Sequence, residues 1–452
     1  MGGNSPLRVT RAGPRRGPIL VTAFGVVFFV AASSGPASTR ATTSVLRSPQ
    51  IPPPADSVRG PDWSTLQAWL APEPRLRVGI LPDASGVAID ADSGVVVLAL
   101  GSDGVPEGGG LRLPRATFVP VGISGHVSLL EAAAILQSAV VVPVIPGETL
   151  AADGAPYRGY LELQSDEETV RVVNVVNVED YLRGVVPNEL SPAAGPGFEA
   201  VKAQAVAART YALRQRGDYA AKGYDLCATQ ACQVYRGLAS EHPRTDKAVA
   251  ETRGLIVQYR GIPIKALYTS SCGGHTEDVE KVFVGERERP YLRGVACTSE
   301  PVEFLERHRP RAARGSSEMD PGRWQVSMRP DEVARAVSRY ALLDDVRDVQ
   351  LRRIGASGRV LEVAVIGDRE REELVLKGFD VRKGLGLREN LFVMDRDTDA
   401  LGAVRRFVFT GQGWGHGVGL CQAGAIGMAH AGARFEQILA HYYTGVALQK
   451  AY

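Results

Sequence analysis

The sequence has almost no excess of charge of either sign. Its 52 basic and 50 acidic side chains give a formal net charge of +2 at pH 7. Proteins that neutralise nucleic-acid phosphates usually present a basic surface, which this balance does not supply. Apolar residues make up 44% of the chain and charged residues 23%, as in ordinary soluble globular proteins. We therefore expect no nucleic-acid partner, and neither a disordered chain nor a polytopic membrane protein.

Acidic residues are absent from residues 1–50. Four arginines precede an apolar run from Ile19 to Ala32, which is the order of an export signal and argues against a buried core segment. The run is 14 residues long, shorter than the roughly 20 that cross a bilayer comfortably. No cysteine follows it, so lipoprotein processing is not expected. Removal of the four arginines would change the net charge from +2 to −2.

The chain is longer than the roughly 250–300 residues at which a single core stops growing, so more than one structural unit is expected. We interpret residues 1–35 as a signal peptide or N-terminal anchor, and 36–75 as a linker rich in Ser, Thr and Pro. Residues 76–305 form the core, 306–400 an inserted strand-helix-strand lobe, and 401–452 a Gly-rich loop and a helix that complete the core. The chain would act in the periplasm or at the cell surface, and would touch the membrane only through its N-terminal segment.

Short apolar runs separated by Gly-rich turns predict strands of ordinary length. They are Leu76–Leu81, Val95–Leu100, Ala139–Ile145, Arg158–Leu163 and Val170–Val178. Helices are predicted over Phe198–Gln215, Pro330–Tyr340 and Phe435–Tyr442. The predicted fold class is α+β, with a mixed β-rich core around a central buried helix.

The predicted helix at 198–215 has one stripe of small residues, which favours close packing and a central position. The stripe consists of Val201, Ala205, Ala208 and Ala212. Lys202 and Arg209 are seven residues apart on a neighbouring face, so they can point together into a cleft.

Four local patterns carry most of the functional signal. They are Val178–Leu190, Lys202–Tyr211, Tyr268–Glu277 and Gly411–Ala425. Together, and in this order, they closely resemble the SpoIID/LytB family of bacterial cell-wall proteins over roughly residues 76–450. The resemblance implies one of two activities. SpoIID-like members are lytic transglycosylases that cleave glycan strands with a Glu at the position of Glu189, whereas LytB-like members enhance a partner amidase.

The surroundings of Glu189 agree with an acid role. Val185, Val186 and Leu190 flank this carboxyl group and should exclude water, which raises the pKa of an acid. Most glycosidases use two carboxylates. A lytic transglycosylase can work with one, because the muramic acid 6-hydroxyl closes a 1,6-anhydro ring and returns its proton to the same Glu. The alternative is that Glu189 begins a turn or pairs with Arg209.

The other candidate residues would bind substrate. Lys202 and Arg209 could bind the lactyl carboxylate of muramic acid or peptide-stem groups, or could form structural ion pairs. Tyr291 and Arg293 match a family segment linked to activity, with Arg where Lys is common. His416 lies among five alternating glycines, where it could donate to a sugar or only fix the loop. A nucleotide loop is disfavoured, because no Lys-Ser/Thr follows.

Five cysteines occur in a chain that is expected to be exported, where disulfides can form. Some family members bind zinc through a Cys-x4-Cys segment with a His before the second Cys. Here Cys227 and Cys232 have Ala231 at that place, so a disulfide is favoured over metal, with zinc as the alternative. We also expect a Cys272–Cys297 disulfide, although four cysteines allow three pairings and the sequence does not fix which one forms. Cys421, where the family usually has Ser, would then be a buried and unreactive thiol.

The Gly-rich loop differs from the family at a second position, Ala423, where Trp is usual. The favoured function is nevertheless a lytic transglycosylase that acts on peptide-trimmed glycan strands, without a cofactor. The alternative is a non-catalytic enhancer that binds glycan or a cell-wall amidase. A purely structural envelope protein would leave the four patterns without a role.

Overall fold

The computed structural model describes residues 73–101, 104–123, 125–166, 168–192, 197–297, 300, 322–369 and 372–452. The predicted signal peptide (1–35) and nearly all of the predicted linker (36–75) lie outside these ranges. None of the described helices combines the length and the apolar character that a bilayer crossing requires.

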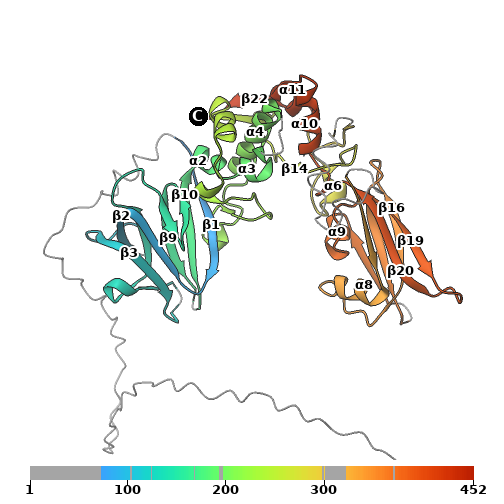
Figure 1. Ribbon diagram of the computed structural model, residues 1–452, viewed down its shortest axis with the longest axis horizontal. Coiled ribbons are helices and arrows are strands. Elements are labelled where there is room, and N and C mark those ends of the chain that lie inside the picture. The colour runs from blue at the N-terminus through green and yellow to red at the C-terminus, as the bar shows by residue number, and fades with distance from the viewer. Residues whose placement is uncertain are drawn as a thin grey trace, which may run out of the picture. The chain divides into compact units, whose positions relative to one another are not determined.

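The N-terminal part of the described chain is an 11-stranded sheet (Figure 1). Its strands are β1 (Arg75–Ala84), β2 (Val87–Leu100), β3 (Leu111–Pro120), β4 (Val127–Leu129), β5 (Ala134–Leu136), β6 (Ser138–Pro143), β7 (Leu150–Ala152), β8 (Ala155–Tyr157), β9 (Tyr160–Ser165), β10 (Val170–Asn177) and β11 (Leu226–Cys227). All pairs are antiparallel except β1–β11. Ile89, Phe118 and Leu150 are fully buried on one side, which gives this sheet a core of its own.

A helical unit follows, with α4 at its centre (Figure 1). Its helices are α2 (Val178–Arg183), α3 (Val186–Glu189), α4 (Phe198–Arg214), α5 (Pro243–Glu251), α6 (Val279–Val282), α10 (Gln422–His430) and α11 (Phe435–Tyr442). Two small sheets complete it: β12 (Leu255–Tyr259) with β13 (Ile262–Pro263) and β22 (Ala447–Lys450), and β14 (Tyr268–Thr269) parallel to β21 (Leu420–Cys421).

Helix α4 is buried because small residues allow its neighbours to approach. The predicted stripe is completely inaccessible to solvent, as are Ala203 and Ala207 on other faces. Helices α5, α10 and α11 all contact α4. The prediction of a central buried helix is therefore confirmed.

Within the described residues, the inserted lobe has two three-stranded sheets and two helices. These are β15 (Arg323–Met328), α8 (Pro330–Val337), β16 (Val346–Ile354), β17 (Val360–Gly367), β18 (Glu373–Lys377), α9 (Phe379–Gly384), β19 (Phe392–Thr398) and β20 (Val404–Gln412). Strand β20 lies in the predicted final segment (401–452) but pairs with both β15 and β19 of the lobe. Its Phe407 and Phe409 lie in the core of the lobe, so the lobe extends to Gln412.

The α+β class is confirmed: strands occur in every unit, α8 and α9 lie in the lobe, and the other described α-helices belong to the helical unit around α4. The predicted final helix has the bounds of α11, and α4 ends one residue before the predicted end. Helices α5 and α10 were not predicted. Helix α10 has Ala, Gly and Ile at positions that are buried on all sides, so it lacks the amphipathic pattern by which a surface helix is recognised.

Candidate functional site

Glu189 is the last residue of α3, which follows α2 after a short turn at Gly184 and Val185. Gly184 lies at this turn, and a Cβ there would come within 2.6 Å of the Tyr235 ring, so a larger residue would displace the neighbouring loop. The Asn188 side chain donates to the carbonyl oxygens of Gly184 and Val234 at 2.7 and 3.3 Å. The turn and the loop at 234 are thereby tied together on either side of Glu189.

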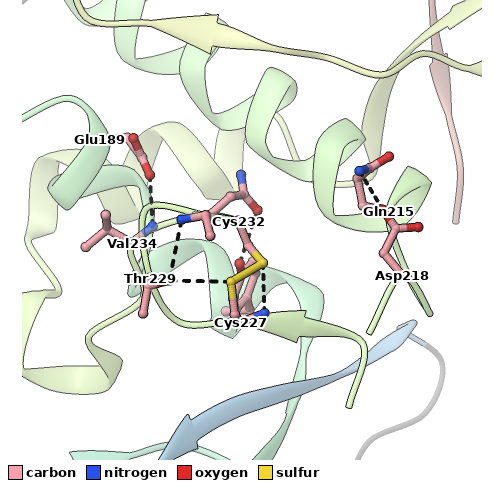
Figure 2. Close-up of a disulfide and its surroundings, with 10 residues drawn as sticks. Glu189, Gln215, Asp218, Cys227, Thr229, Cys232 and Val234 are labelled. Atoms are coloured by element: carbon pink, nitrogen blue, oxygen red, sulfur yellow. Dashed lines mark hydrogen bonds between the residues drawn. A yellow bond between two sulfur atoms is a disulfide. The ribbon is translucent and has the colours of Figure 1, made fainter. Parts of the chain in front are cut away.

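The Glu189 carboxyl group is enclosed but remains partly exposed. Its Oε1 accepts a hydrogen bond from the backbone N–H of Val234 at 3.0 Å, as Figure 2 shows. Burial raises the pKa of Glu189, and hydrogen bonds from Val234, Tyr268 and Gln422 oppose this shift without cancelling it. None of these groups is a carboxylate. Glu189 is therefore an acid that keeps its proton to higher pH than an exposed Glu does.

Buried polar side chains form a chain of hydrogen bonds that ends at Glu189. The Tyr181 hydroxyl donates to Gln233 Oε1 at 3.1 Å, and Gln233 Nε2 donates to the Tyr268 hydroxyl at 3.0 Å. The Tyr268 oxygen thus accepts from Gln233 and can direct its own proton to Glu189. This order of donors fixes the position of the carboxyl group.

Two glutamines close the other side of the site. Gln422, the first residue of α10, hydrogen-bonds Glu189, and its Nε2 donates to Gln204 Oε1 on α4 at 3.3 Å. Gln204 is completely buried, and its Nε2 has no hydrogen-bond partner among the described residues. The site is therefore assembled from α2, α3, α4, α10, β14 and the loop after β11.

The loop that carries Gln233 and Val234 is closed by a disulfide between Cys227 and Cys232 (Figure 2). The Tyr235 N–H, just after the bridge, also donates to the carbonyl oxygen of Ala228 inside the bridged loop, at 3.1 Å. The predicted Cys227–Cys232 disulfide is confirmed. Its place in the fold makes it a support for the backbone N–H that holds Glu189.

Comparison with known proteins shows the family to which the chain belongs. The family model described as "Stage II sporulation protein" matches residues 166–259, which contain Glu189 and the disulfide loop. A stage II sporulation protein D of Bacillus amyloliquefaciens is 31% identical over 296 residues, which are 62% of this chain and 76% of that protein. The chain belongs to the SpoIID/LytB family.

Two further relatives of this SpoIID/LytB family member differ in coverage. An uncharacterized protein of Brachyspira hyodysenteriae is 31% identical over 314 residues, 69% of this chain and 77% of that protein. The amidase enhancer of Bacillus subtilis is 28% identical over 305 residues, 59% of this chain but only 40% of the enhancer. Residues 277–419, which include the inserted lobe, match a domain of unknown function (DUF8618).

Arg209 does not reach Glu189 in this SpoIID/LytB fold. Its side chain is completely buried and forms a two-pronged ion pair with Glu179 on α2, at 2.8 and 2.7 Å. It also donates to the carbonyl oxygens of Leu255 and Val249 at 3.1 and 3.2 Å. The structure thus places Arg209 as an internal cross-link between α2, α4, α5 and β12.

Lys202 likewise forms ion pairs within the helical unit. Its Nζ lies 3.0 Å from Glu199 and 2.8 Å from Glu251, and 4.9 Å from the centre of the Phe198 ring. Lys202 and Arg209 therefore do not share a cleft.

Tyr291 and Arg293 have contacts of their own, and neither is among the contacts of Glu189. The Tyr291 hydroxyl accepts from the Lys265 N–H at 3.3 Å and its ring packs on Tyr259. Arg293 pairs with Glu280, and with Glu288 at 3.1 Å.

His416 holds the Gly-rich loop of the family in place. Its Nδ1 accepts from the Val418 N–H at 3.1 Å, and its ring packs edge-on against Phe283. Burial lowers the pKa of His416 to about 4, with the positive charge of Arg382 adding to the effect. The ring is neutral at pH 7, so it supplies no positive charge to a ligand.

The predicted Cys272–Cys297 disulfide is wrong. Cys272, Cys297 and Cys421 are all free and buried, and they lie together. Of these three, the prediction paired the two nearest in sequence, whereas parallel pairing of β14 with β21 brings the sulfur of the distant Cys421 within 4.8 Å of the other two. Cys421 is free and buried as expected, but it is one member of a group of three.

The sequence analysis missed most of the neighbours of Glu189. Tyr268 and Gln422 lie inside two of the four patterns, so their positions were marked without their role. Tyr181 and Gln204 lie inside the other two patterns, again without an assigned role, and Gln233 lies outside all four.

Proposed function

We propose that this protein is a lytic transglycosylase that cleaves the glycan strands of peptidoglycan, with Glu189 as the only acid and base. The observation that carries the proposal is a single carboxyl group, raised in pKa by burial and held by an amide, a tyrosine and a glutamine rather than by a cation. Such a group keeps its proton to higher pH than an exposed Glu does, and it can give that proton to an oxygen that leaves.

The reaction needs only one carboxyl group. Glu189 donates its proton to the glycosidic oxygen, and the bond from that oxygen to the muramic anomeric carbon breaks. The 6-hydroxyl of the same sugar then forms a new bond to the anomeric carbon, and its proton passes to the Glu189 carboxylate. The products are a strand with a free 4-hydroxyl and a strand with a 1,6-anhydro end, and the enzyme returns to its starting state.

The mass of the products distinguishes the possible functions. Digestion of peptide-free glycan strands should give 1,6-anhydro-muramyl ends, which lack one water relative to reducing ends. Reducing ends would mean hydrolysis, which requires an activated water and a different mechanism. No products from folded protein would contradict the transglycosylase proposal.

The second candidate is a non-catalytic amidase enhancer, favoured by the relative of that name in Bacillus subtilis. In this case the protein would bind glycan or a cell-wall amidase, and Glu189 would serve the fold. Increased turnover by an added amidase, together with no anhydro products, would support it. In either role we propose an exported protein that acts outside the cytoplasmic membrane.

Replacement of Tyr268 by Phe should shift the pH dependence of the reaction upward. The hydroxyl lowers the pKa of Glu189, so its loss lets burial raise that pKa further. The acid form is the active one, and the rate falls as pH rises through the pKa. A hydrogen bond to a charged group is worth about 1.5–3 kcal/mol, so a shift of about one pH unit or more in the alkaline limb is expected. Tyr235→Phe is the control, since its hydroxyl bonds Asn174 instead. An unmoved limb in Tyr268→Phe would remove Tyr268 from the site.

Loss of the Cys227–Cys232 bridge should reduce both stability and rate. For a loop this short, chain entropy predicts a loss of about 2 kcal/mol in the free energy of unfolding of the Cys227→Ser/Cys232→Ser variant. We expect the rate to fall about tenfold even well below the melting temperature, because the Val234 N–H is less well fixed. A full rate in the destabilised variant would show that the loop holds Glu189 without its bridge.

A further inference from the structure

Three cysteines and one glutamate meet in the helical unit, outside the contacts of Glu189. The cluster consists of Cys272, Cys297, Cys421 and Glu300, whose sulfur atoms and one carboxylate oxygen all lie within 4.8 Å of one another. Cys272 and Cys421 are completely buried, Cys297 is 3% exposed, and Glu300 is partly exposed. These four residues are called the three-cysteine cluster below.

The donor set and its spacing fit a zinc ion. Tetrahedral zinc holds thiolate sulfurs at about 2.3 Å, which places neighbouring ligands about 3.5–4 Å apart. Three sulfurs and a carboxylate oxygen within 4.8 Å match that spacing with little movement. Soft sulfur ligands favour zinc over magnesium, calcium or manganese.

Backbone amides already point at the cluster as they do around metal-bound thiolates. Cys421 Sγ accepts from the N–H groups of Cys272 and Gly424, each at 3.3 Å. Glu300 Oε1 accepts from the N–H groups of Cys272 and Gly273 at 2.8 and 3.2 Å. Such donors orient ligands and stabilise their negative charge.

A buried arginine of the inserted lobe binds the backbone turn that follows Cys272. Arg359 is completely buried, and its Nη2 and Nη1 donate to the carbonyl oxygens of Cys272 and His275 at 2.7 and 2.6 Å. It is partnered by Glu389 at 3.4 Å, so the pair brings no net charge but fixes the backbone of the turn.

We propose that the three-cysteine cluster is a structural zinc site. It is separate from the Cys227–Cys232 segment, which the disulfide occupies. Zinc would displace the thiol protons to solvent and take four protein ligands, which leaves no open position for catalysis. Cys272 follows β14 and Cys421 ends β21, whereas Cys297 and Glu300 precede the inserted lobe. The ion would therefore link the segment that enters the lobe with strand β21, which follows the lobe. This proposal replaces the expectation that the protein has no cofactor.

Metal analysis of the native full-length protein tests the site directly. After incubation with zinc and removal of the excess, we expect about one zinc per chain. The matched variants are Glu300→Gln, which leaves the buried cysteines in place, and Cys421→Ser, which removes one sulfur. Each should weaken zinc binding at least 10–100-fold. The Cys227→Ser/Cys232→Ser variant should keep its zinc. Zinc-free wild-type protein, or full zinc in both single-site variants, would overturn the proposal.

Thiol counting and melting curves separate zinc from a second disulfide. Denatured, unreduced protein in the presence of a chelator should show three free thiols. A single free thiol would mean that two members of the cluster are bridged, and the zinc site would be refuted. A chelator should lower the melting temperature of the wild-type protein, and added zinc should restore it. The melting temperature of Cys421→Ser should respond to neither.

Discussion

We expect Glu189→Gln to lose nearly all formation of anhydro-muramyl products while the protein stays folded. The amide cannot donate the proton that the leaving oxygen needs, and loss of a general acid reduces rates by about 10²–10⁴-fold. The amide oxygen can still accept from the Val234 N–H, so the local geometry should survive. The measurement is the initial rate of product formation, followed by mass spectrometry. A folded variant with an undiminished rate would remove Glu189 from the mechanism.

Stability measurements distinguish a loss of catalysis in Glu189→Gln from a loss of folding. Because the folded pKa of Glu189 is raised, the wild-type protein loses stability as pH rises through that pKa, whereas glutamine does not titrate. The free energy of unfolding of Glu189→Gln should therefore improve relative to wild type as pH rises. Glu107→Gln, at an exposed position between β2 and β3, is the matched control and should change neither rate nor stability.

Arg209→Ala should destabilise the protein by about 3–5 kcal/mol. The substitution leaves the Glu179 carboxylate buried without its cation, and breaking a buried pair has costs of this size. Denaturant unfolding measures the loss. Arg214→Ala is the control on the same helix, at an exposed position, and should stay within about 0.5 kcal/mol of wild type.

The Arg209–Glu179 ion pair should also affect how stability depends on pH and how stable a double variant is. Although burial alone would raise it, Arg209 holds the pKa of Glu179 below its usual value. The stability from this pair is thus present above the unfolded pKa and is lost as pH falls through the folded one, so wild type and Arg209→Ala should converge in acid. Adding Glu179→Gln to Arg209→Ala should recover part of the loss. A stable Arg209→Ala protein that fails to bind glycan would instead assign Arg209 to the substrate.

The sequence was informative where a property depends on adjacent residues. The stripe of small residues identified α4, and Val185, Val186 and Leu190 predicted a poorly solvated Glu189, whose pKa is indeed raised by burial. Close spacing likewise identified the Cys227–Cys232 bridge, because a five-residue separation is closed by the local turn.

Prediction failed where the partner comes from a distant segment. Arg209 had several possible carboxylates, and the choice of Glu179, 30 residues away, depends on how α2 packs against α4. Gln422 reaches Gln204 across 218 residues, and Cys421 reaches Cys272 across 149. Such contacts depend on how distant strands and helices pack against one another, and no local sequence pattern predicts that packing.

The enclosure of α4 by α10 and α11 has a consequence for how the chain folds. The buried face of α4 can be covered only after residues 422–442 have been made, and Tyr452 donates to Glu179 from 273 residues further along the chain. Contacts between such distant segments slow folding, because long loops must close before their contacts stabilise anything. We expect the helical unit to fold late and all at once, whereas the N-terminal sheet, whose β2, β3, β6 and β9 are close neighbours in sequence, can form first. Until residues 422–442 cover it, α4 exposes its stripe of small residues, and the incompletely folded chain is susceptible to proteolysis and aggregation.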